Sequence, residues 1–226
     1  MDTHHQTLKK VGIALIIVGC IDIALMIYCI INRISYSSSF NIFAVIAGIF
    51  LFRGGLKTAL FVSWFSAFML CTLVGALLIM PIFIPFDLII TYLKLSPSIL
   101  IKPVFFGILI FSFLLWIYKS LTAPHIFKAM DENNINRKSR WKKPTTGFLA
   151  GGCLIILLAI TVPFLIGGET VEQAKIRAQE EVGRGYKFTV SSINVQSTFG
   201  GKTQIKAQVI AYNDEEIKHI PLSWEK

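Results

Sequence analysis

The chain has 226 residues, of which 54% are hydrophobic and only 15% are charged. Soluble domains carry about 25% charged residues, so much of this surface is not expected to face water. The net charge of +9 does not indicate nucleic acid, because the cations lie between apolar stretches. Residues 1–166 hold 14 Lys or Arg against 5 Asp or Glu, whereas residues 167–226 hold 8 of each. We therefore expect the lipid bilayer, and no nucleic acid, as the partner of the basic residues.

Five apolar stretches predict a multi-span α-helical membrane protein. A helix needs about 20 apolar residues to cross the hydrocarbon layer, and all five stretches approach or reach that length. The predicted spans follow a short N-terminus, residues 1–10, and cover residues 11–31, 36–52, 58–80, 100–118 and 147–166. The first stretch is too long for the core of a signal peptide, so we interpret it as a retained anchor.

A proline-rich stretch, residues 82–98, separates the third and fourth spans. It is amphipathic but too short to cross a bilayer, which favours a helix lying in the outer interface with Asp87 and Lys94 toward water. A re-entrant segment is the alternative. Pro81 is expected to end the third span, and Pro103 to lie in the first turn of the fourth span.

The distribution of cations predicts the orientation of the spans. The linker 119–146 holds seven Lys or Arg against two acidic residues, so it is expected to be cytoplasmic. Counting back places the turn after the second span and the N-terminus on the same side. The cations that determine this topology are Lys9, Lys10, Arg53, Lys57, Arg137, Lys138, Arg140, Lys142 and Lys143. The C-terminus is then extracytoplasmic, and periplasmic in a Gram-negative bacterium.

Residues 167–226 predict a small extracytoplasmic α+β domain. Thr170 and Gln173 match a capping box, and Gly183 is placed to end the helix that follows. About three antiparallel strands follow, with a bulge near Ser191 and a hairpin turn at residues 199–202. Pro221 makes the last strand an edge strand, because proline has no N–H to donate to a neighbouring strand.

Two places are candidates for function. Asp22 lies midway along the first span, where a carboxylate is costly and could bind a cation or relay a proton. A structural role, hydrogen-bonded to a neighbouring helix, is the plainer interpretation. The other candidate is the last strand with Pro221, Leu222 and Trp224, because an open edge can pair with another chain. Trp224 is slightly more consistent with a core position.

The sequence contains no pattern typical of catalysis, of a cofactor site or of a metal site. Nucleotide-binding fingerprints and nucleophile elbows are absent, and the four histidines lack metal-ligand spacing. We therefore expect a non-enzymatic inner-membrane protein that presents an extracytoplasmic interaction domain to an envelope protein or a second copy. The alternatives are a small transporter or channel subunit that uses Asp22, and an envelope immunity or resistance factor.

Overall fold

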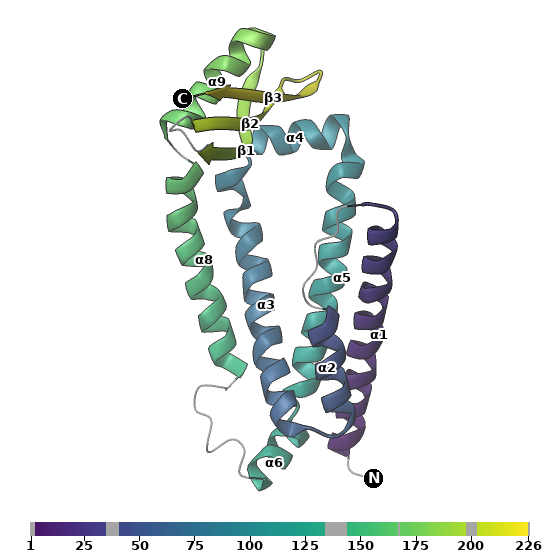
Figure 1. Ribbon diagram of the computed structural model, residues 1–226. Coiled ribbons are helices and arrows are strands. Elements are labelled where there is room, and N and C mark those ends of the chain that lie inside the picture. The colour runs from purple at the N-terminus through teal and green to yellow at the C-terminus, as the bar shows by residue number, and fades with distance from the viewer. Residues whose placement is uncertain (1–2, 35–40, 134–143, 167, 198–202, 226) are drawn as a thin grey trace. The chain divides into compact units, whose positions relative to one another are not determined.

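The computed structural model is mostly helical and ends in a small antiparallel sheet (Figure 1). It describes residues 3–34, 41–133, 144–166, 168–197 and 203–225. The chain divides into two compact units, one of residues 1–73 with 109–153, and the other of residues 74–108 with 154–226. The division cuts through three long helices. The C-terminal domain therefore belongs to one unit with the helical segments that precede it.

In the part of the chain that the structure describes, four helices are long and apolar enough to cross a membrane, which is compatible with a membrane protein. They are α1 (Thr3–Ile31), α3 (Leu56–Phe83), α5 (Pro97–Leu121) and α8 (Pro144–Ile166). Large apolar side chains are exposed on all four, as expected of surfaces that contact lipid rather than water.

The fifth predicted span is not established at full length. Helix α2 (Asn41–Phe52) has 12 residues, which extend about 18 Å against a hydrocarbon layer of about 30 Å. Residues 36–40, with which the predicted span begins, lie outside the described residues. The structure therefore gives four helices of membrane length and one shorter apolar helix.

Two predictions about prolines are wrong: Pro81 does not end the third long helix, and Pro103 does not lie in the first turn of the fourth. Helix α3 continues through Pro81 to Phe83, and Pro103 lies in the second turn of α5 because that helix already begins at Pro97. A proline removes one backbone hydrogen bond, whereas ending a helix in an apolar solvent leaves several groups unsatisfied. Continuing the helix is therefore the less costly choice. Pro97 occupies the position where proline costs least.

Part of the basic linker is also helical, which the sequence analysis missed. Helix α6 (Pro124–Glu132) buries Ile126, Ala129 and Met130 and begins with Pro124 at its first turn. Its apolar residues are spaced three and four apart, so one side of this short helix is apolar. Residues 134–143 lie outside the described part of the chain.

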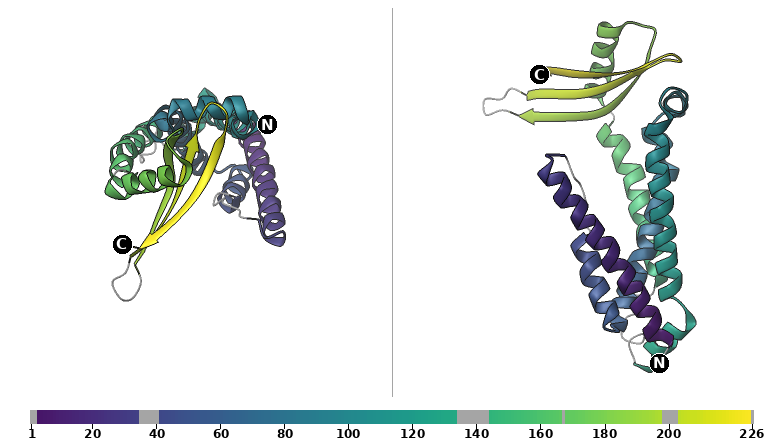
Figure 2. Two further views of the ribbon diagram at one scale, coloured as in Figure 1. Left: turned by 90° about the horizontal axis from the view of Figure 1, so that it is seen from above. Right: turned by 90° about the vertical axis from the view of Figure 1, so that its right-hand side faces the viewer.

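Glycines allow α1 and α2 to pack closely as an antiparallel pair (Figures 1 and 2). A Cβ atom on Gly12 would lie 2.7 Å from the Gly48 carbonyl oxygen and 2.8 Å from the Phe52 nitrogen. A Cβ on Gly48 would lie 2.7 Å from the Gly12 carbonyl oxygen. Neither position has room for a side chain, because the atoms that it would meet belong to the backbone of the other helix.

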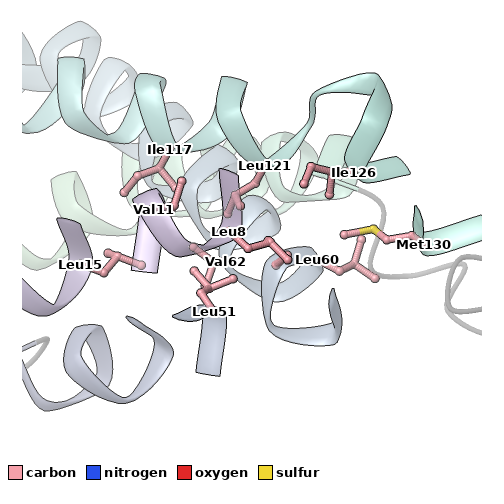
Figure 3. Close-up of a cluster of buried hydrophobic side chains, with 11 residues drawn as sticks. Leu8, Val11, Leu15, Leu51, Leu60, Val62, Ile117, Leu121, Ile126 and Met130 are labelled. Atoms are coloured by element: carbon pink, nitrogen blue, oxygen red, sulfur yellow. The ribbon is translucent and has the colours of Figure 1, made fainter. Parts of the chain in front are cut away.

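The core of the first unit collects apolar side chains from α1, α2, α3, α5 and α6 (Figure 3). Leu8 and Ile126 are fully buried in it, and Thr7 hydrogen-bonds to His125 at 3.0 Å beside it. At the same end of α1, His5 lies against Gly54, and the Lys9 ammonium lies 5.7 Å from the centre of the Phe52 ring. The N-terminal end of α1, the turn after α2 and helix α6 therefore meet at one end of this unit.

Two glycines of α8 hold that helix against α3 within the same unit. A Cβ on Gly147 would lie 2.3 Å from the Trp64 carbonyl oxygen, and one on Gly151 would lie 2.8 Å from the Cys71 Cβ. Thr146 accepts a hydrogen bond from the Trp64 indole at 3.0 Å beside this contact. The G-x-x-x-G spacing of α8 thus serves packing inside the chain.

The C-terminal domain consists of one helix packed on three strands. Helix α9 (Glu169–Val182) covers one side of an antiparallel sheet in the order β1 (Lys187–Ser197), β2 (Thr203–Tyr212) and β3 (Ile217–Glu225). Ala174 and Ala178 of α9 are fully buried against the alternating core side chains of β2, which are Ile205, Ala207, Val209 and Ala211. Small residues on the helix let it approach the sheet closely.

The local predictions for this domain are partly confirmed. The bulge is present between Val190 and Ser192, and Gly183 ends α9 with φ +94° and a hydrogen bond from its N–H to the Gln179 carbonyl. The capping box is wrong, because α9 begins at Glu169 and Thr170 already lies inside the helix. The two acidic residues of the first turn favour that earlier start through the helix dipole. The hairpin turn at residues 199–202 lies outside the described residues.

Alanine substitutions test the close packing of α1 and α2. Gly12→Ala should lower the thermal stability of the detergent-solubilised chain, because the new methyl group meets backbone atoms that cannot move aside. Gly107→Ala in α5 is the control, since nothing lies within 4 Å of a Cβ there. It should be neutral or gain up to about 1 kcal/mol from the higher helix propensity of alanine. Equal melting temperatures for the two variants would contradict the packing described here.

Candidate functional site

Asp22 lies half-buried on the side of α1 that packs against α2. The buried residues Gly12, Leu15 and Gly19 recur at helical spacing, and Asp22 follows Gly19 by three residues. The Ser63 and Thr72 hydroxyls of α3 donate to the carbonyls three residues earlier in the same helix. Asp22 therefore belongs to the contact between α1 and α2.

The packing of the two helices places Asp22 about level with Asn41, the first described residue of α2. Ile16 packs against Gly48, and both helices rise about 1.5 Å per residue. The distance from Ile16 to Asp22 along α1 is thus about that from Gly48 back to Asn41. Residues 35–40, which precede Asn41, lie outside the described part of the chain. A carboxylate that faces a neighbouring helix at this level can accept hydrogen bonds, which suits a structural role.

We expect Asp22→Asn to be tolerated and Asp22→Leu to be destabilising. Asparagine keeps a side-chain oxygen that can accept hydrogen bonds. Leucine has no such acceptor, so a donor that bonds to residue 22 would be left unsatisfied, which costs about 1–3 kcal/mol of stability. Unfolding of the detergent-solubilised chain measures both, and Cys20→Leu at a neighbouring exposed position is the control. If asparagine is as damaging as leucine, the negative charge itself matters, and a cation-binding or proton-relay role gains support.

The predicted interaction strand β3 is an edge strand, but its tryptophan is not exposed. Trp224 is 7% exposed in the core of the domain, with the Arg177 guanidinium 5.1 Å from the centre of its ring. Its indole nitrogen is buried and has no hydrogen-bond partner among the described residues. Leu222 is half-buried, and only Pro221 of the three predicted residues is exposed.

Both edges of the sheet carry features that discourage strand pairing. Pro221 removes an N–H from the middle of β3, and the bulge at Ser191 interrupts the regular spacing of β1. The Ser191 hydroxyl donates to the Gln208 carbonyl at 3.0 Å, which ties the bulged residue to β2. The edges are thus poorer surfaces for strand addition than the sequence analysis expected.

The side of the sheet opposite α9 offers a flat polar surface instead. The strand register aligns three rows of exposed residues there: Ser192, Gln208 and Pro221; Asn194, Lys206 and Ser223; Gln196, Gln204 and Glu225. We call these nine residues the open sheet face. It carries one cation and one anion, so amide and hydroxyl groups dominate its chemistry.

A second surface forms where the C-terminal domain meets helix α4 (Phe86–Leu95). The Lys187 ammonium lies 2.5 Å from the Asp87 carboxylate, and both side chains are exposed. The hydrogen bond to Asp87 raises the pKa of Lys187 above its ordinary value. Asp87 and Lys94 were expected to point toward water, and both are exposed; Asp87 in addition pairs with Lys187 of the C-terminal domain.

Beside this pair lies a groove of about 400 Å³, which we call the α4 groove. It is lined by Asp87, Ile90, Thr91, Arg184, Gly185, Tyr186, Lys187, Tyr212, Asn213 and Asp214. On its rim, the Tyr186 hydroxyl bonds to Glu216 and to Lys218. The Lys218 ammonium, 2.7 Å from the Glu216 carboxylate, lowers the pKa of Glu216. The groove thus combines both signs of charge with aromatic and apolar walls.

Among the described residues, no group of three His, Cys, Asp or Glu side chains is placed to hold a metal ion. His125 bonds to Thr7, and His5 lies against Gly54, so both contribute to packing. Four of the predicted topology residues, Lys9, Lys10, Arg53 and Lys57, lie in the described part, whereas Arg137, Lys138, Arg140, Lys142 and Lys143 lie outside it.

Comparison with models of known protein families, with curated proteins and with solved structures found no match. The function must therefore be argued from the residues and their arrangement.

Proposed function

We propose that this chain is a non-enzymatic integral protein of the plasma (inner) membrane that presents its C-terminal α+β domain as an extracytoplasmic binding module. The open sheet face carries this proposal. The domain has its own core of buried residues from α9 and all three strands, so the nine exposed residues on the other side are not needed to form that core. Flat surfaces rich in amides and hydroxyls suit a protein partner better than a small molecule, which needs a concave site.

A five-span topology with a cytoplasmic N-terminus accompanies this proposal. The contacts between His5 and Gly54 and between Thr7 and His125 are its support, because they gather three basic segments at one end of the first unit. Helices α1 and α3 both begin at that end, so the chain between them has to cross back to it, and we assign this crossing to α2. The positive-inside rule assigns this end to the cytoplasm. The C-terminal domain then lies on the opposite side, periplasmic in a Gram-negative bacterium.

Cysteine labelling separates five crossings from four. In a cysteine-free background, Lys175→Cys on the exposed side of α9 should react with a membrane-impermeant maleimide in intact cells. Gln6→Cys at the exposed N-terminal end of α1 should react only after the membrane is opened. An even number of crossings would place both cysteines on the same side, and equal labelling would therefore overturn the five-span proposal.

Photo-crosslinking in cells tests the binding module. Probes at Lys206 and Ser223, which face each other across β2 and β3, should give discrete adducts with one envelope protein or with a second copy. A probe at Lys175 on the exposed side of α9 is the matched control and should give none. Adducts at Lys175 alone, or no adducts from an abundant folded protein, would contradict binding at the open sheet face.

A transporter or channel function is less well supported by the position of Asp22. Its place on the side of α1 that faces α2 suits a structural, hydrogen-bonding role that requires no ion or proton movement. No observation on the described residues favours an immunity or resistance role over other binding functions.

A further inference from the structure

The α4 groove has a composition that neither packing nor the open sheet face accounts for. Its charged residues come from four places: Asp87 from α4, Arg184 from the segment between α9 and β1, Lys187 from the first position of β1, and Asp214 from the turn after β2. Lys187 is engaged by Asp87. The Arg184 guanidinium is exposed and makes no ion pair with any residue in the described ranges. The groove is therefore lined by a cation that has no ion pair within the described ranges and by the acidic Asp214.

Helix α4 connects this groove to an apolar surface. Phe86, Ile90 and Leu93 lie on one side of α4 and are all more than half exposed, whereas Leu88 and Thr91 on the other side are buried. An exposed apolar row on an amphipathic helix that directly follows an apolar span is suited to the interface of a bilayer. Ile90 belongs both to this row and to the α4 groove.

The apolar row continues into a second groove that has no polar lining. Leu93 lines it together with Leu100, Ile101, Val104, Phe105 and Ile108 of α5. Ile90 lines the polar groove with both signs of charge, and Leu93, one turn further along the same side of α4, lines an apolar groove of about 360 Å³. This combination matches an amphiphile with a zwitterionic head and a hydrocarbon chain.

We propose that the α4 groove binds the headgroup of an amine-bearing, zwitterionic glycerophospholipid from the surrounding bilayer. The Arg184 guanidinium binds the phosphate, because its planar donors match phosphate oxygens. Asp214 accepts from the primary ammonium group, which a choline headgroup could not donate. One acyl chain lies along Ile90 and Leu93 toward α5. The lipid would fix the C-terminal domain at the membrane surface beside the Lys187–Asp87 pair.

Lipid retention by the purified full-length chain tests this site. The chain is reconstituted in vesicles of equal parts phosphatidylethanolamine, phosphatidylglycerol and phosphatidylcholine, extracted in mild detergent, and analysed by native mass spectrometry. Phosphatidylethanolamine should be the main retained lipid. Arg184→Gln should retain about tenfold less of it, since a charge-assisted hydrogen bond of about 1.4 kcal/mol corresponds to that factor. Asp214→Asn should weaken the preference for phosphatidylethanolamine over phosphatidylglycerol.

Two further variants make the result decisive. Lys175→Gln removes one exposed cation from the outer side of α9 and should leave retention unchanged. Arg184→Lys keeps the charge without the planar donors and should fall between wild type and Arg184→Gln. Equal retention by Arg184→Gln and Lys175→Gln, or retained lipid in the proportions of the vesicles, would overturn the proposal. The measurement uses the chain alone, so its outcome is independent of any protein partner.

Discussion

The satisfaction of backbone hydrogen bonds in an apolar environment is the constraint on which the rest of this structure depends. A peptide group that loses its partner in lipid cannot turn to water, so each long apolar segment forms one uninterrupted helix. This explains why α3 continues through Pro81 and why α5 contains Pro103. The same constraint makes a carboxylate within an apolar span costly, and Asp22 lies half-buried on the side of α1 that packs against α2, where polar groups of a neighbouring helix can bond to it.

The elements that the sequence predicted well are those governed by a single repeating pattern. Continuous apolar stretches indicated the long helices, and alternation in β2 indicated which side of that strand is buried, from Ile205 to Ala211. Pro221 indicated an edge strand, and the change of alternation in β1 indicated the bulge. Each of these features depends on residues that lie close together in the chain, so the local pattern of residue types is enough to predict it.

The features that the sequence did not predict depend on contacts between distant residues. Nothing local shows that Asp87 pairs with Lys187, a hundred positions later, rather than with water. Helix α6 was missed because its three buried residues are few and charged residues surround them; its burial depends on Leu8 of α1. The capping-box pattern at Thr170 was misleading because α9 begins two residues earlier than that pattern implies. Its N-cap is Gly168, and the helix dipole favours the acidic side chains of Glu169 and Glu172 in the first turn.

The two candidate surfaces of the C-terminal domain lie on the same side of its sheet. Lys187 and Tyr212 pair with each other in the strand register, at the end where α4 and its groove are found. The open sheet face continues from there toward the far ends of β1 and β2, on the side away from α9. A protein bound to this face would consequently lie beside α4. If α4 rests in the bilayer interface through Phe86, Ile90 and Leu93, the position of the domain at the membrane surface also determines how such a partner is oriented. A lipid in the α4 groove and a protein on the open sheet face are therefore compatible occupants, and the first would prepare the surface that the second uses.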